Sequence, residues 1–258
     1  MSLAGKHAIV TGGSRGIGLA VAQRLAQEGA RVSIVSRSTP QRVTLSPSTS
    51  LRTGSVEGSF HATADVCNES EIRAAFQACR DANGPIDILV NNAGIVESST
   101  LGRTSLEMWD RIIATNLTGT FLCTREVFAE MTAAKWGRIV NVASTAGLVG
   151  APYISAYCAS KHGVVGFTRA VAAEAAGTGV TVNAVCPGYT ETDILRNAVA
   201  NITAKTGRDE EETRRLLAAS NPQGRIATVE EVAEAVLILV NGSQTGEAMI
   251  VPIGEALY

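Results

Sequence analysis

The stretch "IVTGGSRGIGLAVAQRLAQEGA", Ile9–Ala30, combines a short apolar run, a glycine-rich turn and an amphipathic helical pattern. Three glycines of the turn, Gly12, Gly16 and Gly18, follow the spacing G-x-x-x-G-x-G. Glycine permits a tight turn and lets the backbone approach a ligand, while the free N–H groups and the positive dipole end of the following helix attract an anion. Since the turn joins the first strand to the first helix, it predicts a dinucleotide-binding fold with the pyrophosphate at the helix N-terminus.

The rest of the chain repeats this order of strand and helix. Its apolar runs are continuous rather than strictly alternating, which is typical of strands covered on both faces. We therefore predict a Rossmann-type, doubly wound α/β sheet of about seven parallel strands with helices on both faces, in one domain over residues 1–258. The predicted strands are His7–Val10, Arg31–Ser36, Phe60–Ala64, Ile86–Asn91, Arg138–Ala143, Thr181–Val185 and Ala248–Val251. The predicted helices are Gly16–Gln27, Glu69–Ala82, Ser105–Ala134, Ser155–Ala176 and Thr228–Val240.

Two segments depart from this order. Ser38–Ser59 carries two prolines, two glycines and many Ser and Thr residues where a crossover helix is expected, so we predict an irregular loop there. The long stretch Tyr189–Arg225 contains the charged pattern "GRDEEETRRLL". This stretch is either a solvated surface helix or part of a lid over a substrate pocket.

Composition narrows the classes of function. Among 258 residues, 22 Lys and Arg against 24 Asp and Glu give a net charge of −2, which leaves no basic excess for binding a nucleic acid. The apolar run Ala235–Val240 is too short to cross a membrane and the first residues resemble no signal peptide, so we expect a cytoplasmic protein without a membrane segment. The five cysteines form no C-x-x-C pair and the three histidines lie far apart, so no metal site is predicted.

The end of the second strand bears on which dinucleotide is bound. An Asp or Glu at that position would accept hydrogen bonds from the adenosine ribose and favour NAD. The strand instead ends in "IVSRS", Ile34–Ser38, without a carboxylate. Arg37, together with Arg15 of the glycine turn, is placed to hold a 2′-phosphate, which favours NADP over NAD. The alternative is that both are ordinary surface arginines.

Two further strand ends fit a bound dinucleotide. Asp65 and Val66 follow the third strand, where they would contact the adenine. The motif "NNAG", Asn91–Gly94, ends the fourth strand at the edge of the sheet where ligands bind in such folds. The alternative for this motif is a tight loop that needs Gly94 only for its backbone angles.

The stretch that follows the fifth strand carries groups suited to acid–base chemistry. Ser144 lies just past that strand, and the next helix brings Tyr157 and Lys161 one turn apart. A lysine ammonium near a phenol favours the phenolate and lowers its pKa, so Tyr157 could donate a proton to a carbonyl oxygen and Ser144 could hold that oxygen. If the helix extends back to Tyr153, this second tyrosine shares the same face. Its place after Pro152 suits the start of a helix and a contact with substrate rather than proton transfer.

These motifs together resemble the short-chain dehydrogenase/reductase family. The motifs "TGGSRGIG", "NNAG", the serine after the fifth strand, Y-x-x-x-K and "PGYTET" occur in the family's order over almost the whole chain. The resemblance implies an NADP-dependent oxidoreductase with a catalytic tetrad of Asn116, Ser144, Tyr157 and Lys161. It also implies that Asn116 opens a kink in its helix and holds a water that relays protons from Lys161; from the residues alone, Asn116 is equally a structural hydrogen-bonding residue. The remaining predicted cofactor contacts are Ser14, Ile17, Asn92, Ala93, Gly94, Tyr157, Lys161, Pro187, Gly188, Thr190 and Thr192.

Within the family, the stretch "GFTRAVAAEAAGTGVTVNAVCPGYTETDI" is similar to 3-oxoacyl reductases and 3-hydroxyacyl dehydrogenases. Reductases of carrier-protein substrates usually carry basic residues beside the site, but here Ala173 takes one such position and only Lys135 partly keeps the other, which favours an acyl-CoA thioester or a free ketone. Arg196, Lys205 and Arg208 would then meet the CoA phosphates, or are ordinary solvated charges. The predicted substrate contacts are Ser144, Tyr153 and Tyr189.

The leading hypothesis is therefore the NADPH-dependent reduction of a ketone, a 3-oxoacyl thioester, to a secondary alcohol. Two alternatives stay open, an NAD(P)-dependent dehydrogenase of a small cyclic or secondary alcohol and a non-catalytic dinucleotide-binding protein. The resemblance implies a homo-oligomer, either a tetramer or a dimer. The tail "IVPIGEALY" departs from the family's glycine-rich C-terminus, which leaves the mode of assembly open.

Overall fold

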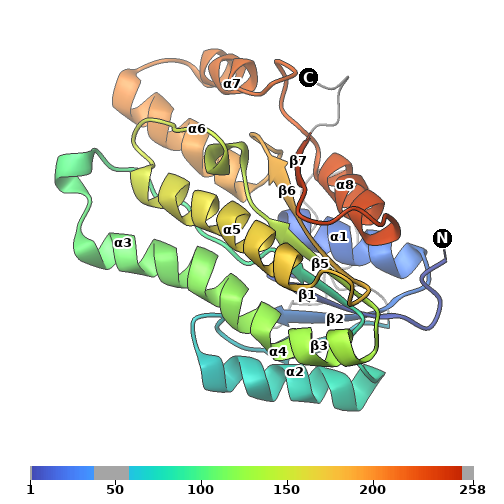
Figure 1. Ribbon diagram of the computed structural model, residues 1–258. Helices are drawn as coiled ribbons and strands as arrows, with labels where there is room; N and C mark the ends of the chain where they lie inside the picture. The colour runs from blue at the N-terminus through green and yellow to red at the C-terminus, as the bar shows by residue number, and fades with distance from the viewer. Residues whose placement is uncertain (1, 38–57, 252–258) are drawn as a thin grey trace.

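Seven parallel strands form one sheet in the computed structural model, which describes residues 2–37 and 58–251. The strand order is β3-β2-β1-β4-β5-β6-β7, and the order reverses between β1 and β4 (Figure 1). This confirms the predicted doubly wound, Rossmann-type sheet. The strands are β1 (His7–Thr11), β2 (Arg31–Ser36), β3 (Phe60–Thr63), β4 (Ile88–Asn91), β5 (Gly137–Val142), β6 (Val180–Pro187) and β7 (Ala248–Val251). The loop predicted over Ser38–Ser59 lies outside the described residues except for its last two.

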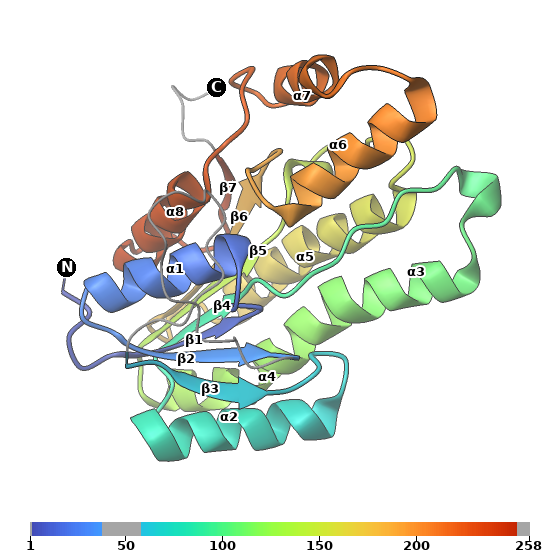
Figure 2. The same cartoon turned by 180° about the vertical axis from the view of Figure 1, so that it is seen from behind.

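Helices cover both faces of the sheet. On one face α1 and α8 pack together, and on the other lie α2, α4 and α5 (Figures 1 and 2). The helix bounds are α1 (Gly16–Gln27), α2 (Glu69–Asn83), α3 (Leu106–Ile113), α4 (Gly119–Ala133), α5 (Ser155–Glu174), α6 (Asp193–Thr206), α7 (Glu210–Ala219) and α8 (Val229–Asn241). In the part of the chain that the structure describes, no helix is both long enough and apolar enough to cross a membrane.

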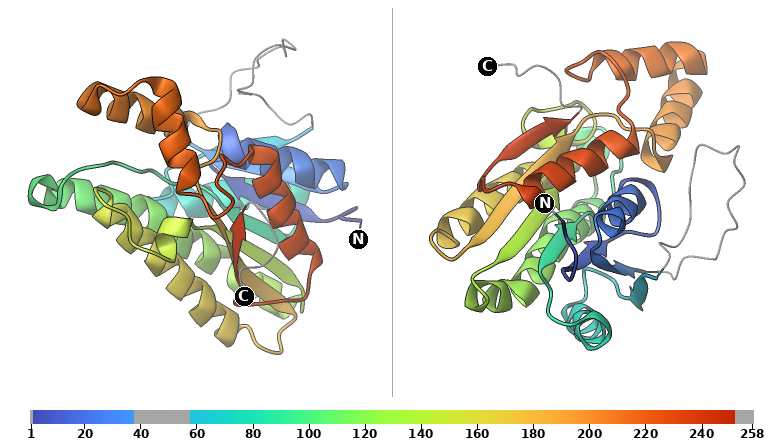
Figure 3. Two further views of the ribbon diagram at one scale, coloured as in Figure 1. Left: turned by 90° about the horizontal axis from the view of Figure 1, so that it is seen from above. Right: turned by 90° about the vertical axis from the view of Figure 1, so that its right-hand side faces the viewer.

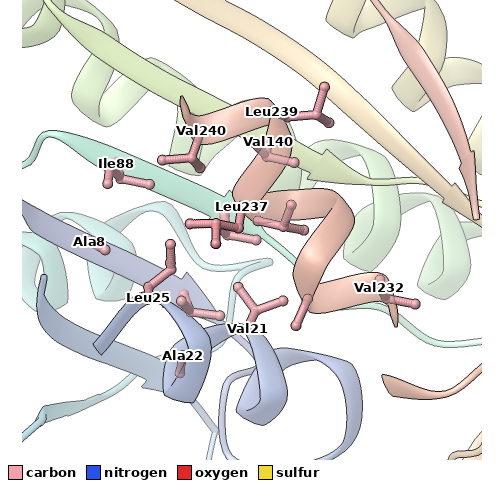
Figure 4. Close-up of a cluster of buried hydrophobic side chains, with 14 of the residues drawn as sticks. Ala8, Val21, Ala22, Leu25, Ile88, Val140, Val232, Leu237, Leu239 and Val240 are labelled. Atoms are coloured by element: carbon pink, nitrogen blue, oxygen red, sulfur yellow. The ribbon is translucent and has the colours of Figure 1, made fainter. Parts of the chain in front are cut away.

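The core explains why the strands read as continuous apolar runs. Every residue of β1 and of β6 is buried, so both faces of these strands must be apolar or internally paired. Side chains of α1 and α8 meet the sheet around β1, β4 and β5, as Figure 4 shows for Leu25, Leu237 and Val140. Burying each such side chain contributes roughly 1.5–3 kcal/mol to stability. This packing covers one face of β1 and β4 and holds the two strands in the core.

One predicted helix contains a π turn. The helix predicted over Ser105–Ala134 is a continuous helical run in which η2 (Ala114–Thr118) lies between α3 and α4, at the place where the resemblance implies a kink. A π turn carries one residue more per turn than an α-helix and often marks a functional site. The sequence pattern alone could not separate the two because apolar periodicity barely changes over five residues.

The segment Tyr189–Arg225 contains the two helices α6 and α7, which stand apart from the layers that cover the sheet (Figure 3). Asp209 caps α7 by accepting a hydrogen bond from the N–H of Glu212, and three glutamates occupy the first turn. The two helices share a small apolar cluster of their own, formed by Leu195, Val199 and Leu217. The charged pattern is therefore a surface helix whose inner side holds this segment together.

A buried histidine lies at the opposite end of β1 from the glycine turn. His7 is fully buried, with one ring nitrogen 2.8 Å from the Gly84 carbonyl oxygen and the other 2.8 Å from the Ser33 hydroxyl. Burial disfavours the imidazolium and lowers the pKa of His7 below its usual 6.5. The folded chain therefore holds this ring neutral.

As the pH falls, the His7→Gln variant is expected to lose less free energy of unfolding than the wild-type chain. The unfolded chain binds a proton on His7 near pH 6.5 and the folded chain does so only at lower pH, so this contribution to stability is complete above pH 6.5 and is lost as the pH falls below it. Free energies of unfolding from urea titrations between pH 8 and 5 should fall more steeply for the wild-type chain than for His7→Gln. Parallel curves would contradict the assignment. His61, whose pKa is also lowered by burial, titrates in both proteins and cancels in the comparison.

Candidate functional site

The glycine turn between β1 and α1 needs its glycines for two different reasons. Gly12 and Gly16 have φ values of +65° and +53°, which side chains rarely adopt. A Cβ on Gly18 would lie 2.4 Å from the Asn92 amide nitrogen and 2.5 Å from the Gly12 carbonyl oxygen. Arg15 caps α1 in an extended conformation and its side chain makes no capping hydrogen bond. The first N–H groups of α1 are therefore available to an anion.

The NNAG loop after β4 is tied to the glycine turn. The Asn92 side chain donates to the carbonyl oxygens of Thr11 and Gly12 at 3.0 and 3.1 Å. The Thr11 hydroxyl accepts from the backbone N–H groups of Asn92 and Ala93 at 3.0 and 3.1 Å. Sequence reasoning missed Thr11, although a threonine as the last residue of the first strand was a usable signal. These four hydrogen bonds hold two strand ends at one edge of the sheet.

Gly94 is needed for space rather than for its backbone angles. Its φ is not in the left-handed region, so the alternative of a loop that requires glycine for its angles is wrong. A Cβ on Gly94 would instead lie 3.2 Å from the Asn116 side-chain oxygen and 3.6 Å from the Lys161 ammonium nitrogen. The backbone at Gly94 thus passes directly over two of the predicted catalytic side chains.

The residues predicted to contact adenosine lie after the ends of β2 and β3. Arg37 follows β2 and is exposed, close enough to Cys67 for its charge to act on that thiol. Asp65 accepts a hydrogen bond from the Cys67 N–H at 2.9 Å, and Val66 is buried against Gly119. Asp65, Val66 and Arg37 therefore border one region, as expected from their places at neighbouring strand ends.

Arg15, which was predicted to bind a 2′-phosphate together with Arg37, is paired with an acidic residue. Its guanidinium forms an ion pair with Asp193, the first residue of α6, at 3.5 Å. Asp193 also pairs with Arg196 on the next turn of the same helix. Thr192, beside Asp193, places a methyl carbon 3.6 Å from where a Cβ on Gly16 would lie. The start of α6 therefore rests against the glycine turn.

Ser144, Tyr157 and Lys161 converge at the carboxyl end of β5. The Ser144 hydroxyl lies close enough to the Tyr157 hydroxyl to lower its pKa. The Ser144 oxygen also accepts from the Ala146 N–H at 3.1 Å, within the short helix η3 (Thr145–Gly147). Lys161 is 5% exposed, donates to the Val142 carbonyl oxygen at 2.7 Å and lies 5.7 Å from the centre of the Tyr157 ring. The predicted serine, tyrosine and lysine therefore form one cluster.

The pKa of Tyr157 is raised, whereas the sequence predicted that Lys161 would lower it. Burial disfavours the phenolate and raises this pKa to about 12; the neighbouring Ser144 hydroxyl acts in the opposite direction, and Lys161 is not among the groups that shift it. Burial also lowers the pKa of Lys161 to about 8. The spacing along the helix predicts that Tyr157 and Lys161 are close together. It does not predict that both groups are buried away from water. Tyr157 holds its proton at neutral pH, as a proton donor must.

Asn116 lies in the π turn and is fully buried. Its side chain donates to the Ile95 carbonyl oxygen and to the Ser160 hydroxyl at 2.9 and 3.0 Å, and accepts from the Ile95 N–H at 2.8 Å. The chain opens where the resemblance implies a kink, and the side chain is also a structural hydrogen-bonding group. It joins the NNAG loop to α5. Sequence reasoning missed Ser160, which the buried face of α5 could have indicated.

Tyr153 does not lie on the same helix as Tyr157. The helix α5 begins at Ser155, as predicted from its pattern, so it does not extend back to Tyr153, and Pro152 lies before its start. Tyr153 adopts φ +68°, and its carbonyl oxygen accepts a hydrogen bond from the Ser99 N–H at 2.7 Å. Its side chain is 65% exposed. This turn holds an exposed aromatic ring ahead of the helix that carries Tyr157.

The loop after β6 carries the remaining predicted residues. The Pro187 carbonyl oxygen accepts from the Ser144 hydroxyl at 3.4 Å, and the Thr190 hydroxyl donates to the Gly188 carbonyl oxygen at 3.1 Å. Tyr189 is partly buried beside the apolar cluster of α6 and α7, and burial raises its pKa. Over residues 2–37 and 58–251, no group of three or more His, Cys, Asp or Glu side chains could hold a metal ion.

The arrangement can bind a dinucleotide along the glycine turn and present a phenol and a hydroxyl to a carbonyl oxygen. Comparison with known proteins agrees with this chemistry. The family model described as short chain dehydrogenase matches residues 6–203. The D-beta-hydroxybutyrate dehydrogenase of Rhizobium meliloti is 39% identical over 237 residues, which covers 91% of each chain.

Two further proteins bear on fold and chemistry. The 3-oxoacyl-(acyl-carrier-protein) reductase of Vibrio cholerae is 39% identical over 252 residues, 96% of each chain. Among solved structures, a variant of actinorhodin polyketide ketoreductase with NADPH has a TM-score of 0.84 and 36% identity, with 95% of each chain covered. A 3-oxoacyl reductase and a polyketide ketoreductase are thus among the proteins similar to this chain.

Proposed function

Because this chain belongs to the short-chain dehydrogenase/reductase family, we propose that it reduces a ketone to a secondary alcohol with NADPH. The observation that carries the proposal is the protonated Tyr157 phenol, which lies beside Ser144 at the sheet edge where the glycine turn and the NNAG loop meet. The chain works as one domain over residues 1–258, with Tyr189–Arg225 as the lid.

The side chains divide the reaction between them. The hydroxyls of Ser144 and Tyr157 hold the carbonyl oxygen of the substrate, and the bound cofactor supplies the hydride to its carbon. Tyr157 donates its proton as negative charge grows on that oxygen. Lys161, fixed by the Val142 carbonyl oxygen, then stabilises the phenolate that remains. Asn116 donates hydrogen bonds to Ile95, which follows the NNAG loop, and to Ser160, which precedes Lys161, and so holds the loop and Lys161 in position.

NADPH rather than NADH is the proposed reductant. The second strand ends without a carboxylate, and the exposed Arg37 follows it directly. The similar ketoreductase structure is described with NADPH, which supports the same choice. Arg15, paired with Asp193, adds to the phosphate site only when that ion pair rearranges. Arg37 is therefore the main proposed ligand of the 2′-phosphate.

Replacing Arg37 with alanine is expected to weaken NADPH binding about ten- to a hundredfold, since a hydrogen bond to a charged group contributes about 1.5–3 kcal/mol. NADH binding should change little because NADH has no 2′-phosphate. Titration calorimetry with both dinucleotides measures the difference. Arg73→Ala, which removes an exposed arginine of α2, is the matched control. An unchanged preference for NADPH in Arg37→Ala would refute the assignment.

A 3-oxoacyl thioester is the proposed substrate, and an acyl-CoA is preferred to an acyl-carrier protein. The similarity to a 3-oxoacyl reductase supports the acyl class. Ala173 and Lys135 are both exposed, so only one of the two compared positions presents a positive charge to an acidic carrier protein. Arg196 and Arg208 are engaged by Asp193 and Glu212, which reduces their value as CoA phosphate ligands. Tyr153 and Tyr189 complete the proposed substrate contacts.

The proposed function is tested by following NADPH oxidation with 3-oxoacyl-CoA thioesters, the same acyl groups on carrier protein, and free ketones. We expect turnover with the CoA thioesters and at least a tenfold lower kcat/KM with NADH, about 1.4 kcal/mol of discrimination. Higher kcat/KM with the carrier-protein substrate would overturn the CoA preference. NADPH binding without turnover of any carbonyl would favour a non-catalytic dinucleotide-binding protein.

A second candidate function is the NAD(P)-dependent oxidation of a small cyclic or secondary alcohol. The similarity to a hydroxybutyrate dehydrogenase favours it. Oxidation assays with NAD⁺, NADP⁺ and a panel of secondary alcohols distinguish the two, because this candidate requires efficient turnover in the oxidative direction. In either case we propose a cytoplasmic homo-oligomer, a tetramer or a dimer.

A further inference from the structure

The two ends of the lid segment are joined to each other. Thr190, near its start, forms a parallel β-bridge with Ala227, just past its end. The Ala227 N–H donates to the Tyr189 carbonyl oxygen and the Glu191 N–H donates to the Ala227 carbonyl oxygen, both at 2.9 Å. The two ends of the lid are therefore held side by side like neighbouring strands.

One side chain completes this junction. Asn221 follows α7 and is 4% exposed. Its side-chain oxygen accepts from the Tyr189 N–H at 2.7 Å, while its amide donates to the carbonyl oxygens of Tyr189 and Arg225 at 2.8 and 2.6 Å. The amide thus pairs with both backbone polar groups of Tyr189, as another strand would. Both of its N–H groups are used in these bonds.

Gly188, the residue before Tyr189, leaves the space that the Asn221 side chain occupies. A Cβ on Gly188 would lie 2.2 Å from the Asn221 side-chain oxygen, so only glycine lets the asparagine approach. Pro187, the preceding residue, accepts the Ser144 hydroxyl, and Thr192, shortly after, lies against Gly16. A shift of the backbone at Tyr189 would therefore disturb the catalytic serine on one side and the glycine turn on the other.

We propose that Asn221 is a positioning residue that fixes the Gly188–Thr190 backbone for cofactor binding, an inference that rests on the proposed dinucleotide-dependent function. The amide is the chemistry required, because the site needs one acceptor and two donors. An aspartate would turn a carboxylate oxygen toward two carbonyl oxygens, which would leave that of Arg225 without its side-chain donor and that of Tyr189 with the Ala227 N–H alone. Protonation of that aspartate would restore one donor.

The test compares Asn221→Asp with Asn201→Asp, an exposed asparagine on α6. For Asn221→Asp we expect the Kd for NADPH to rise at least tenfold at pH 8 and to recover toward the wild-type value as the pH falls to 6, since burial raises the pKa of the new carboxyl group. In enzyme assays the KM for NADPH should rise more than kcat falls. Asn201→Asp should show neither change. Binding equal to that of the wild type at pH 8 would overturn the proposal.

A readout that needs no cofactor separates this inference from the proposed function. Amide hydrogen exchange of residues 187–192 and 224–228 should become at least tenfold faster in Asn221→Asp and in Asn221→Ser, while exchange in β1 and β4 stays unchanged. Unaltered exchange in both variants would overturn the positioning role. A wild-type chain that binds no dinucleotide, with the exchange difference intact, would overturn the proposed function alone. If Asn221→Asp unfolds, the exchange of Asn221→Ser decides.

Discussion

Replacing Tyr157 with phenylalanine is expected to lower ketone reduction at least about a hundredfold, within the range that a positioned general acid contributes. The phenol is the group that can transfer a proton here, because it lies beside Ser144, whose hydroxyl is proposed to hold the same carbonyl oxygen. Its pKa of about 12 keeps it protonated at the pH of the assay. Phenylalanine retains the ring and loses only the hydroxyl, so the packing of α5 should persist.

NADPH binding should survive this substitution within about twofold, because the glycine turn and Arg37 are untouched. Stopped-flow reduction under single turnover measures the chemical step, and fluorescence titration measures the Kd for NADPH. Tyr153→Phe is the matched control from the same stretch, since Tyr153 lies outside α5 and its side chain is 65% exposed. Its chemical step should stay within about threefold of the wild type. Retained turnover in Tyr157→Phe would remove the tyrosine from the role of acid.

The parts of the fold that the sequence predicts are those whose cause is local. Largely apolar runs identified all seven strands to within three residues at either end, because strands covered on both faces leave few polar positions. Gly12 and Gly16 could be recognised since a turn between a strand and a helix requires positive φ there. The order of motifs then brought Ser144, Tyr157 and Lys161 to one sheet edge.

The parts that it does not predict depend on tertiary contacts. The pKa of Tyr157 rises because of what surrounds it, and spacing along a helix carries no information about desolvation. Tyr153 adopts a positive φ before the helix, and its carbonyl oxygen accepts a hydrogen bond from the Ser99 N–H, 54 positions earlier in the chain. The pairing of Asn221 with Tyr189 and of Arg15 with Asp193 likewise joins residues that no local pattern connects.

The addition of a single methyl group at Gly18 is expected to weaken NADPH binding strongly. An alanine Cβ would lie 2.4 Å from the Asn92 side chain and 2.5 Å from the Gly12 carbonyl oxygen, which are held by two strand ends. To make room, Asn92 must give up its hydrogen bonds to Thr11 and Gly12, or the turn must move. Either change displaces the N–H groups that receive the pyrophosphate.

We expect Gly18→Ala to weaken NADPH binding about a hundredfold, the equivalent of two charge-assisted hydrogen bonds of about 1.5 kcal/mol each. Overpacking of the turn should also lower the free energy of unfolding by about 1–3 kcal/mol. Titration calorimetry and urea denaturation measure the two effects.

The matched control is Gly166→Ala, in the middle of α5, where an added Cβ meets nothing within 4 Å. It should bind NADPH normally and gain about 0.5–1 kcal/mol of stability, because alanine has the higher helix propensity. This opposite response separates the contacts at Gly18 from the general effect of replacing a helical glycine. If Gly18→Ala bound NADPH as tightly as Gly166→Ala, the pyrophosphate would have to lie away from this turn, and the proposed cofactor site would be wrong.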